Sequence, residues 1–315
     1  MRFIPFSVVL VAASWLSQPA SAADGQDLLQ RLNDAQRKQS FHGTFVYDSN
    51  GAFSTHGIWS LVGDDGHARL RLLQLDGAEQ EVLRVDGQVE CASGEMGDEL
   101  SKSQLWSARQ LDPKQLNEWY ELIVLGDSRV AGRPTTVLAL VPRDQNRYGL
   151  KLHLDRQTGL PLKSLLVNQK GQLLERFQFT RLHLEAPTSA ALEPGAGCRP
   201  VQDTKQPVAQ ASEWITEWLP PGFVLSSTSQ RLSPVSDEPV ACQVYGDGLA
   251  SFSIFVEPLK GAVAGDFRTQ LGPTAAVSRR VQTADGDVMV TVVGEIPVAA
   301  AERVASSLKI PRGSE

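Results

Sequence analysis

Short apolar runs separated by Asn-Gly and Asp-Gly pairs dominate the first third of the chain. Such pairs supply the positive φ angles that tight hairpin turns demand, so each one separates two antiparallel strands. Four of them lie between positions 50 and 87, namely Asn50-Gly51, Asp65-Gly66, Asp76-Gly77 and Asp86-Gly87. The pattern therefore predicts a meander of antiparallel strands over this part of the chain.

Strict alternation of apolar and polar side chains marks the strands that follow residue 120. The segment 148–154 puts Tyr and Leu side chains on one face and Lys151 and His153 on the other. Such alternation is typical of a sheet with one buried and one solvated face. A helix over 27–38 and a short helix after Asp112 are available to cover the buried face. Since two thin helices cover a wide, curled sheet only in part, we predict a half-open barrel with an apolar groove.

Apolar residues of this sheet are the candidates for lining the groove. Burial of an acyl chain gains about 0.8 kcal/mol per methylene, so partial burial would suffice for lipid binding. Packing of the same residues into a closed core fits the pattern equally well. The candidates are Phe45, Tyr47, Trp59, Leu72, Leu83, Leu152, Phe177 and Phe179.

A change of composition divides the chain into two domains. Residues 187–212 are rich in Pro, Ala, Gly, Thr and Gln and have no apolar periodicity, which is typical of a linker. A first domain over 23–186 precedes it and a second over 213–315 follows. The second domain combines strand-like runs with a final helix over 297–308. We therefore predict a smaller α+β domain after the barrel, which makes the whole chain a β-rich α+β protein.

Residues 1–22 have the organisation of a signal peptide. Arg2 gives a positive start, an apolar run follows over 4–16, and Ala20-Ser21-Ala22 provides the small residues that a signal peptidase reads. The apolar run is shorter than the about 20 residues that span a bilayer. We therefore expect cleavage and export to the periplasm rather than a membrane anchor.

Export permits disulfide bonds. The chain has three cysteines, Cys91, Cys198 and Cys242, and an odd number leaves at least one outside an intramolecular pair. A bond between Cys91, at the end of a strand-like run, and Cys198, just past the first domain, would tie the exit of that domain to its sheet. Three free thiols fit the sequence equally well.

No catalytic or metal-binding motif stands out in the sequence. GxSxG, HExxH, P-loop and GxGxxG patterns are missing from it, and no two of the five histidines have a metal-ligand spacing. We therefore expect a binding protein without enzymatic activity, cofactor or metal ion. With a net charge of −6, the chain lacks the excess of Lys and Arg that is typical of a general nucleic-acid binder.

Five long stretches of the chain carry a resemblance to a known family: Ser40–Trp59, Leu72–Gly87, Arg147–Phe179, Glu217–Phe223 and Tyr245–Leu259. In sequence and in order they resemble the MucB/RseB family of periplasmic regulators. The resemblance implies that the first domain is similar to the lipoprotein carriers LolA and LolB, an unclosed β-barrel with helices at its mouth.

The resemblance also implies a function. The smaller domain would bind the periplasmic region of a membrane-bound, MucA/RseA-like anti-sigma factor and shield it from regulated proteolysis, which keeps the envelope-stress sigma factor inactive. Lipid or lipopolysaccharide would trigger release, and in some members the pathway controls alginate production. Arg231, Arg279 and Arg280 are our candidates for contacting the partner. The oligomeric state stays open, a homo-oligomer included, as do two alternatives: a periplasmic lipid or lipoprotein carrier, and an envelope hydrolase.

Overall fold

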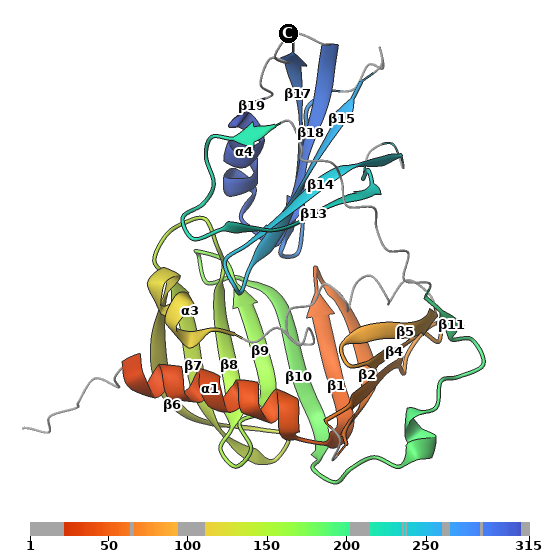
Figure 1. Ribbon diagram of the computed structural model, residues 1–315. Coiled ribbons are helices and arrows are strands. Elements are labelled where there is room, and N and C mark those ends of the chain that lie inside the picture. The colour runs from red at the N-terminus through yellow and green to blue at the C-terminus, as the bar shows by residue number, and fades with distance from the viewer. Residues whose placement is uncertain are drawn as a thin grey trace, which may run out of the picture.

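The computed structural model describes residues 22–63, 66–93, 111–201, 214–234, 236, 238–259, 265–283 and 286–309. The predicted signal peptide, apart from residue 22, and residues 202–212 of the predicted linker therefore lie outside the described residues. Two β-sheets stand one above the other, each with its own helices (Figure 1). Within the described residues, no helix is long and apolar enough to cross a bilayer.

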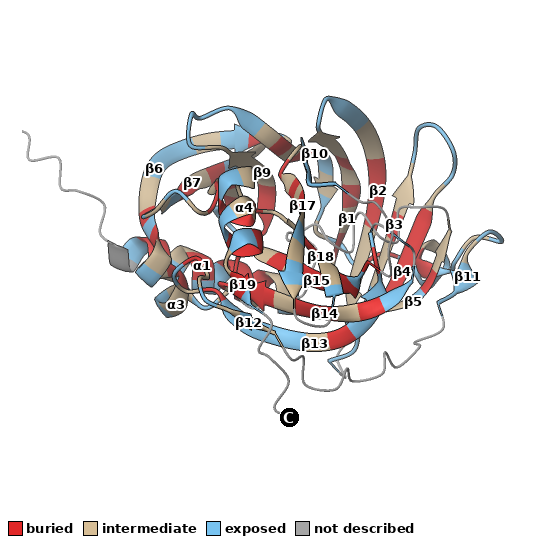
Figure 2. Cartoon of the chain, turned by 90° about the horizontal axis from the view of Figure 1, so that it is seen from above, coloured by how far each residue is buried: buried red, intermediate tan, exposed pale blue. Residues whose placement is uncertain are grey.

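The first sheet has eleven strands in the order β11-β5-β4-β3-β2-β1-β10-β9-β8-β7-β6. This order consists of two antiparallel meanders that meet where β1 pairs with β10. The sheet curls strongly, as the view from above shows, but ends in two separate edge strands, β11 and β6 (Figure 2). The prediction of an unclosed antiparallel barrel is therefore confirmed. Its strands are β1 (Phe41–Ser49), β2 (Ala52–Val62), β3 (Ala68–Gln74), β4 (Glu81–Val85), β5 (Gln88–Ser93), β6 (Tyr120–Val130), β7 (Arg133–Pro142), β8 (Gly149–Asp155), β9 (Pro161–Val167), β10 (Leu173–His183) and β11 (Arg199–Pro200).

Tight turns join β1 to β2 and β4 to β5 where the sequence predicts them, whereas the longer segment 75–80 joins β3 to β4 and residue 65 of the remaining predicted turn lies outside the described residues. Asn50 and Gly51 both have positive φ, 53° and 76°, and Asp86 and Gly87 repeat the pattern with 52° and 81°. Two successive positive φ angles are the signature of the hairpin turn that matches the twist of the flanking strands. The turn chemistry therefore fixes the register of these hairpins.

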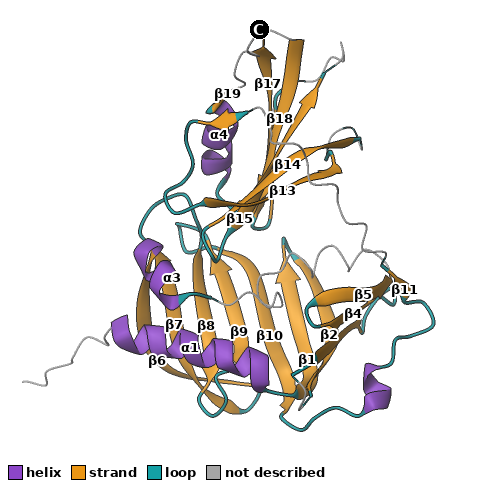
Figure 3. Cartoon of the chain, viewed as in Figure 1, coloured by secondary structure: helices purple, strands orange, loops and turns teal. Residues whose placement is uncertain are grey.

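Helix α1 (Ala22–Lys38) crosses the mouth of the barrel, and α3 (Pro113–Trp119) lies beside it (Figure 3). Helix α1 buries Leu29 and Leu32 against the strands of the second meander. Asp112 caps the N-terminus of α3, and its side chain accepts from the backbone N–H groups of residues 114 and 115. Such a cap satisfies donors that the first helical turn leaves unpaired.

The chain after β10 covers the outer face of the first meander. The 3-10 helix η1 (Ser189–Leu192) lies there, strand β11 then joins the edge of the sheet beside β5, and Cys198 forms a disulfide with Cys91 of β5. Beneath this segment Arg71 donates to Glu81 at 2.5 Å and to the carbonyl of Ala191 at 3.1 Å. Residues 189–201 of the predicted linker therefore lie against the first sheet. The third cysteine, Cys242, is free and buried.

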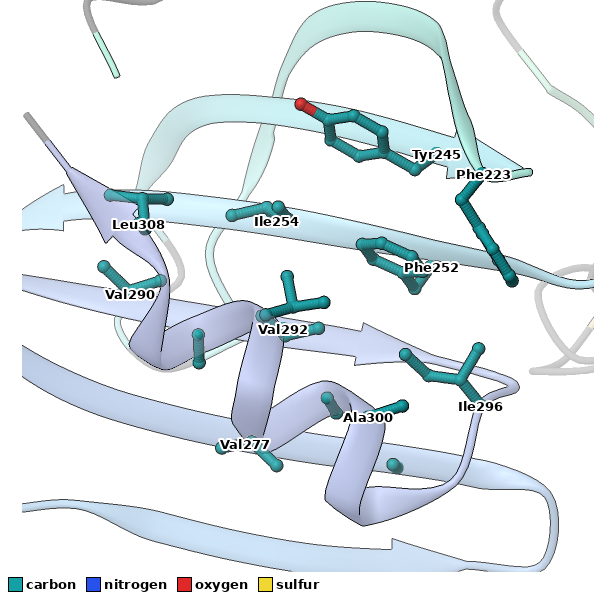
Figure 4. Packing of buried hydrophobic residues seen from close by; sticks show 14 of the residues in the cluster. Phe223, Tyr245, Phe252, Ile254, Val277, Val290, Val292, Ile296, Ala300 and Leu308 are labelled. Atoms are coloured by element: carbon teal, nitrogen blue, oxygen red, sulfur yellow. The ribbon is translucent and has the colours of Figure 1, made fainter. Parts of the chain in front are cut away.

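The second domain is a sheet of six strands in the order β13-β14-β15-β18-β17-β16, with α4 (Val298–Ser306) packed on one face. Figure 4 shows Ala300 of α4 and the rings of Phe223, Tyr245 and Phe252 pointing into the core between helix and sheet. The strands are β13 (Val224–Leu232), β14 (Pro239–Gly246), β15 (Ser251–Pro258), β16 (Phe267–Leu271), β17 (Thr274–Thr283) and β18 (Gly286–Gly294), with a short pair β12 (Ile215–Thr216) and β19 (Leu308–Lys309) beside them. The predicted α+β class is therefore confirmed.

Candidate functional site

A buried arginine lies where the two domains meet. Arg147, in the loop between β7 and β8, is 0% exposed. Its guanidinium donates to both carboxylate oxygens of Asp144, at 3.1 and 2.9 Å. It also crosses to the second domain, where it donates to Asp247 Oδ2 at 2.6 Å and to the carbonyl of Pro221. The Tyr120 hydroxyl donates to the same Asp247 oxygen at 3.0 Å.

Aromatic rings enclose this guanidinium. Its Cζ lies 5.5 Å from the ring centroids of Trp119 and Tyr120 and 5.2 Å from that of Phe223. Gly222 has a φ of +82°, and a Cβ built on it would lie 2.2 Å from the Trp119 ring. Only glycine fits there, because any side chain would both strain the backbone and displace the ring.

The electrostatics keep Arg147 charged. Burial disfavours the cation, but the hydrogen bonds with Asp144 and the Asp247 carboxylate outweigh burial and raise the pKa of Arg147. Burial and the Asp247 charge raise the pKa of Tyr120 well above its ordinary value, so its hydroxyl stays a donor. A fully satisfied buried network of this kind holds its partners in one geometry.

A second link joins the domains nearby. The Tyr148 hydroxyl donates to the carbonyl of Ile296 at 3.0 Å and accepts from Gln270 Nε2 at 2.9 Å. Burial and the charge of Glu295 raise the pKa of Tyr148 to about 12. The junction therefore contains neutral and charged hydrogen bonds, of which those that Asp247 accepts and the one between Tyr148 and Ile296 are buried.

A small cavity lies beside the junction, beneath α1. Its volume is about 40 Å³. Since about 10–15 Å³ of such enclosed volume holds one water molecule, the enclosed part of the cavity has room for only a few waters. Leu249 and Glu295 of the second domain close one side of it. The lining residues are Leu32, Gln36, Leu111, Leu150, Leu152, Ser164, Leu166, Glu175, Leu249 and Glu295.

One lining residue has unusual electrostatics. Glu175 accepts a hydrogen bond from the Tyr47 hydroxyl at 2.8 Å. Burial raises the pKa of Glu175, and burial together with the Glu175 charge raises that of Tyr47. The cavity is therefore largely apolar, and the raised pKa of Glu175 favours the neutral form of its carboxyl group.

The predicted groove residues are distributed over three environments. Leu152 lines the cavity. Tyr47 packs against the core around the β1–β10 pair, in which four other candidates are buried: Phe45, Leu72, Phe177 and Phe179. Trp59 and Leu83 lie on the outer face, because they follow Ile58 and Val82, whose side chains point into that core. The groove prediction therefore has to be corrected for Trp59 and Leu83.

The three candidate arginines do not form one surface. Arg231 lies on the edge strand β13, whereas Arg279 and Arg280 lie on β17, with three strands between. Arg279 lies 3.8 Å from the Asp266 carboxylate, and Arg280 forms an ion pair with Asp287. The structure also brings together two histidines that the sequence left apart, His42 and His183, whose ring centroids lie 4.7 Å from each other.

Known proteins share both domains of this chain. Residues 24–207 match the family model of the MucB/RseB N-terminal domain, and residues 208–309 match that of the C-terminal domain. The chain is 58% identical over 305 residues to the sigma factor AlgU regulatory protein MucB of Pseudomonas aeruginosa, covering 96% of each protein. It is 28% identical over 330 residues to the sigma-E factor regulatory protein RseB of Escherichia coli K12, covering 98% of each.

Solved structures extend this likeness to three dimensions. The complex structure of Pseudomonas aeruginosa MucA/MucB has a TM-score of 0.82 at 58% identity and covers 92% of this chain and 100% of that one. A crystal structure of MucB has a TM-score of 0.69 at 56% identity and covers 93% and 100%. With both of its domains matched and this identity over nearly its whole length, the chain belongs to the MucB/RseB family of sigma factor regulators, which are binding proteins and not enzymes.

Proposed function

We propose that this protein is a periplasmic regulator that binds the periplasmic region of a membrane-bound, MucA/RseA-like anti-sigma factor. The observation that carries the proposal is the likeness to MucB solved together with MucA, at 58% identity and a TM-score of 0.82. The TM-score against MucB alone is lower, 0.69, at nearly the same identity and coverage. This difference supports the view that the domain arrangement described above is the partner-bound one.

In this proposal the protein protects the anti-sigma factor by binding the segment that a protease would cleave. A protease needs an accessible segment, and a segment held against a folded surface is not accessible to it. The junction around Arg147 favours such binding, because two domains already fixed relative to each other lose little freedom when a partner spans both. The envelope-stress sigma factor then stays sequestered by the intact anti-sigma factor.

Release by lipid or lipopolysaccharide would follow from linkage. A lipid shifts the equilibrium between partner-bound and partner-free protein only when it binds the partner-free state more tightly than the partner-bound state. The enclosed part of the cavity, about 40 Å³, is too small for an acyl chain. An acyl chain would therefore have to displace α1 or the loops that carry Leu249 and Glu295. Because the Leu249 loop also carries Asp247, lipid entry would disturb the junction.

A protease-protection assay tests the proposal. The mature protein is mixed with the periplasmic segment of a MucA-like protein, and cleavage of that segment is followed with and without lipopolysaccharide. We expect slower cleavage with the protein present and restored cleavage once lipopolysaccharide is added. Cleavage at the same rate with and without the protein refutes partner protection. Protection that lipopolysaccharide leaves intact refutes only the release step.

A periplasmic lipid or lipoprotein carrier is the alternative. The apolar lining of the cavity favours it, but it gives the second domain no role. Isothermal titration with the anti-sigma segment separates the two functions, because a carrier would give no heat of binding with that segment.

A further inference from the structure

Three potential metal ligands converge on the outer face of the barrel. His42 of β1 and His183 of β10 are direct cross-strand partners, on strands that lie side by side (Figure 1). Their rings stack at an interplanar angle of 16°. Glu185 follows two positions after His183, and the ligand atoms of all three residues lie within 4.8 Å of one another.

The strand register explains why the two imidazoles meet. Directly opposed residues of an antiparallel pair have Cβ atoms about 4.5–5.5 Å apart. The preceding residue of β1, Phe41, is buried in the barrel core, so His42 points outward. His42 is half-buried and the other two side chains are exposed. All three can therefore turn without disturbing the core.

The ligand set suits a borderline divalent metal ion. Imidazole nitrogen and carboxylate oxygen are ligands of Zn²⁺, and three protein ligands leave a fourth position for water. With Zn–N bonds of about 2.0–2.1 Å, two nitrogens of a tetrahedral site lie about 3.4 Å apart. Small side-chain rotations reach this geometry from the separations of up to 4.8 Å.

The surroundings leave the site free for a cation. Within the described part of the chain, no hydrogen bond or ion pair occupies these three side chains. The adjacent outer-face position on β2 is Trp59, the cross-strand partner of His42. Across the strands, Arg71 stacks on Trp59 and pairs with Glu81, which offsets its positive charge. Along β10, Arg181 lies two residues before His183 on the same outward face and is exposed to solvent, which screens its charge from a bound ion.

We propose that His42, His183 and Glu185 form a binding site for a divalent transition-metal ion, with Zn²⁺ as its natural occupant. The ion would bridge β1 and β10, the two strands along which the meanders of the barrel meet. Metal binding would then stabilise this seam, because a ligand that binds only the folded state adds to its stability.

Isothermal titration of the mature, untagged protein with ZnCl₂ tests the site. We expect one equivalent of Zn²⁺ to bind, and His42→Gln or His183→Gln to weaken binding by on the order of 10-fold or more, as losing a direct ligand should cost at least as much as losing an outer-shell partner. The matched control is His67→Gln, which removes an exposed histidine that pairs with Asp86 elsewhere on the barrel. Equal Zn²⁺ affinity in the His42→Gln, His183→Gln and parent proteins would overturn the proposal.

A second measurement distinguishes the proposed site from surface adsorption. Cu²⁺, which binds such ligands more tightly than Zn²⁺, quenches nearby tryptophan, so Trp59 fluorescence should fall on its addition. We expect Trp59→Phe to remove this part of the quenching and His183→Gln to shift it to at least about 10-fold higher Cu²⁺ concentration. Quenching that survives in both variants at the same Cu²⁺ concentration would contradict a site at this position.

Discussion

Replacement of Asp247 with asparagine tests whether the buried network holds the domains together. Asparagine keeps the oxygen that accepts from the backbone N–H groups of Leu249 and Ala250 at 2.8 and 2.7 Å. Its amide group replaces the oxygen that accepts from Arg147 at 2.6 Å and from Tyr120 at 3.0 Å, and therefore faces two donors. The Asp247→Asn substitution thus removes the charge and one acceptor while preserving the shape of the loop.

The size of the destabilisation caused by Asp247→Asn follows from the burial of the ion pair. Removing one partner of a fully buried ion pair costs about 3–5 kcal/mol, since the other charge stays out of water. Asp144 still pairs with Arg147, so we expect the lower end, about 3 kcal/mol. The cost falls on the junction, because the Arg147–Asp247 ion pair joins the first domain to the second.

Urea unfolding and small-angle X-ray scattering measure the effect. We expect Asp247→Asn to lower the urea midpoint and to increase the radius of gyration under native conditions, as domains separate. Tyr120→Phe is the matched control, because it keeps the ring over the guanidinium and loses one hydrogen bond, worth about 1.5 kcal/mol. An Asp247→Asn protein with the parent's midpoint and scattering curve would refute the idea that this network fixes the domains.

Three further changes have defined outcomes. Gly222→Ala should also increase the radius of gyration, because its Cβ would lie 2.2 Å from the Trp119 ring; an unchanged scattering curve argues against this packing. Cys91→Ser opens a loop of 107 residues and should lower the free energy of unfolding by up to about 4.7 kcal/mol, measured in urea without reductant; equal stability would mean that the bond is not formed. Burial raises the pKa of Glu175, so the folded state prefers the neutral carboxyl group and becomes less stable as the pH rises through the pKa of Glu175 in the folded protein. Glu175→Gln should therefore raise the urea midpoint at pH 8 and have little effect near pH 4, and a constant difference across this range would contradict the assignment.

Local sequence patterns were sufficient for the strands and turns. Alternation over 148–154 predicts β8 because the inward side chains must be apolar, whatever packs against them. Asn50-Gly51 and Asp86-Gly87 predict hairpins because few other pairs tolerate two positive φ angles. Trp59 and Leu83 were misplaced because hydrophobicity alone does not say which face a residue occupies when the outer face is also covered.

The sites depend on contacts that no local pattern encodes. Arg147 reads as an ordinary loop arginine, and its burial follows from the docking of Pro221 and Asp247 from the other domain. His42 and His183 belong to different meanders and meet only because β1 pairs with β10. The polar–apolar alternation shows that both face outward, but not that they face each other.

The pairing of β1 with β10 also affects the order in which the parts of the barrel fold. Apart from the short β11–β5 pair, every other contact between neighbouring strands of this sheet joins segments that follow each other closely along the chain. Such hairpins form within about 1–10 μs, whereas closing a long loop must first overcome the entropy of the intervening chain. The pairing of Phe45 with Phe179 closes a loop that contains residues 46–178. We therefore expect a newly exported chain to organise as two separate half-barrels, whose joining is the slow step of maturation.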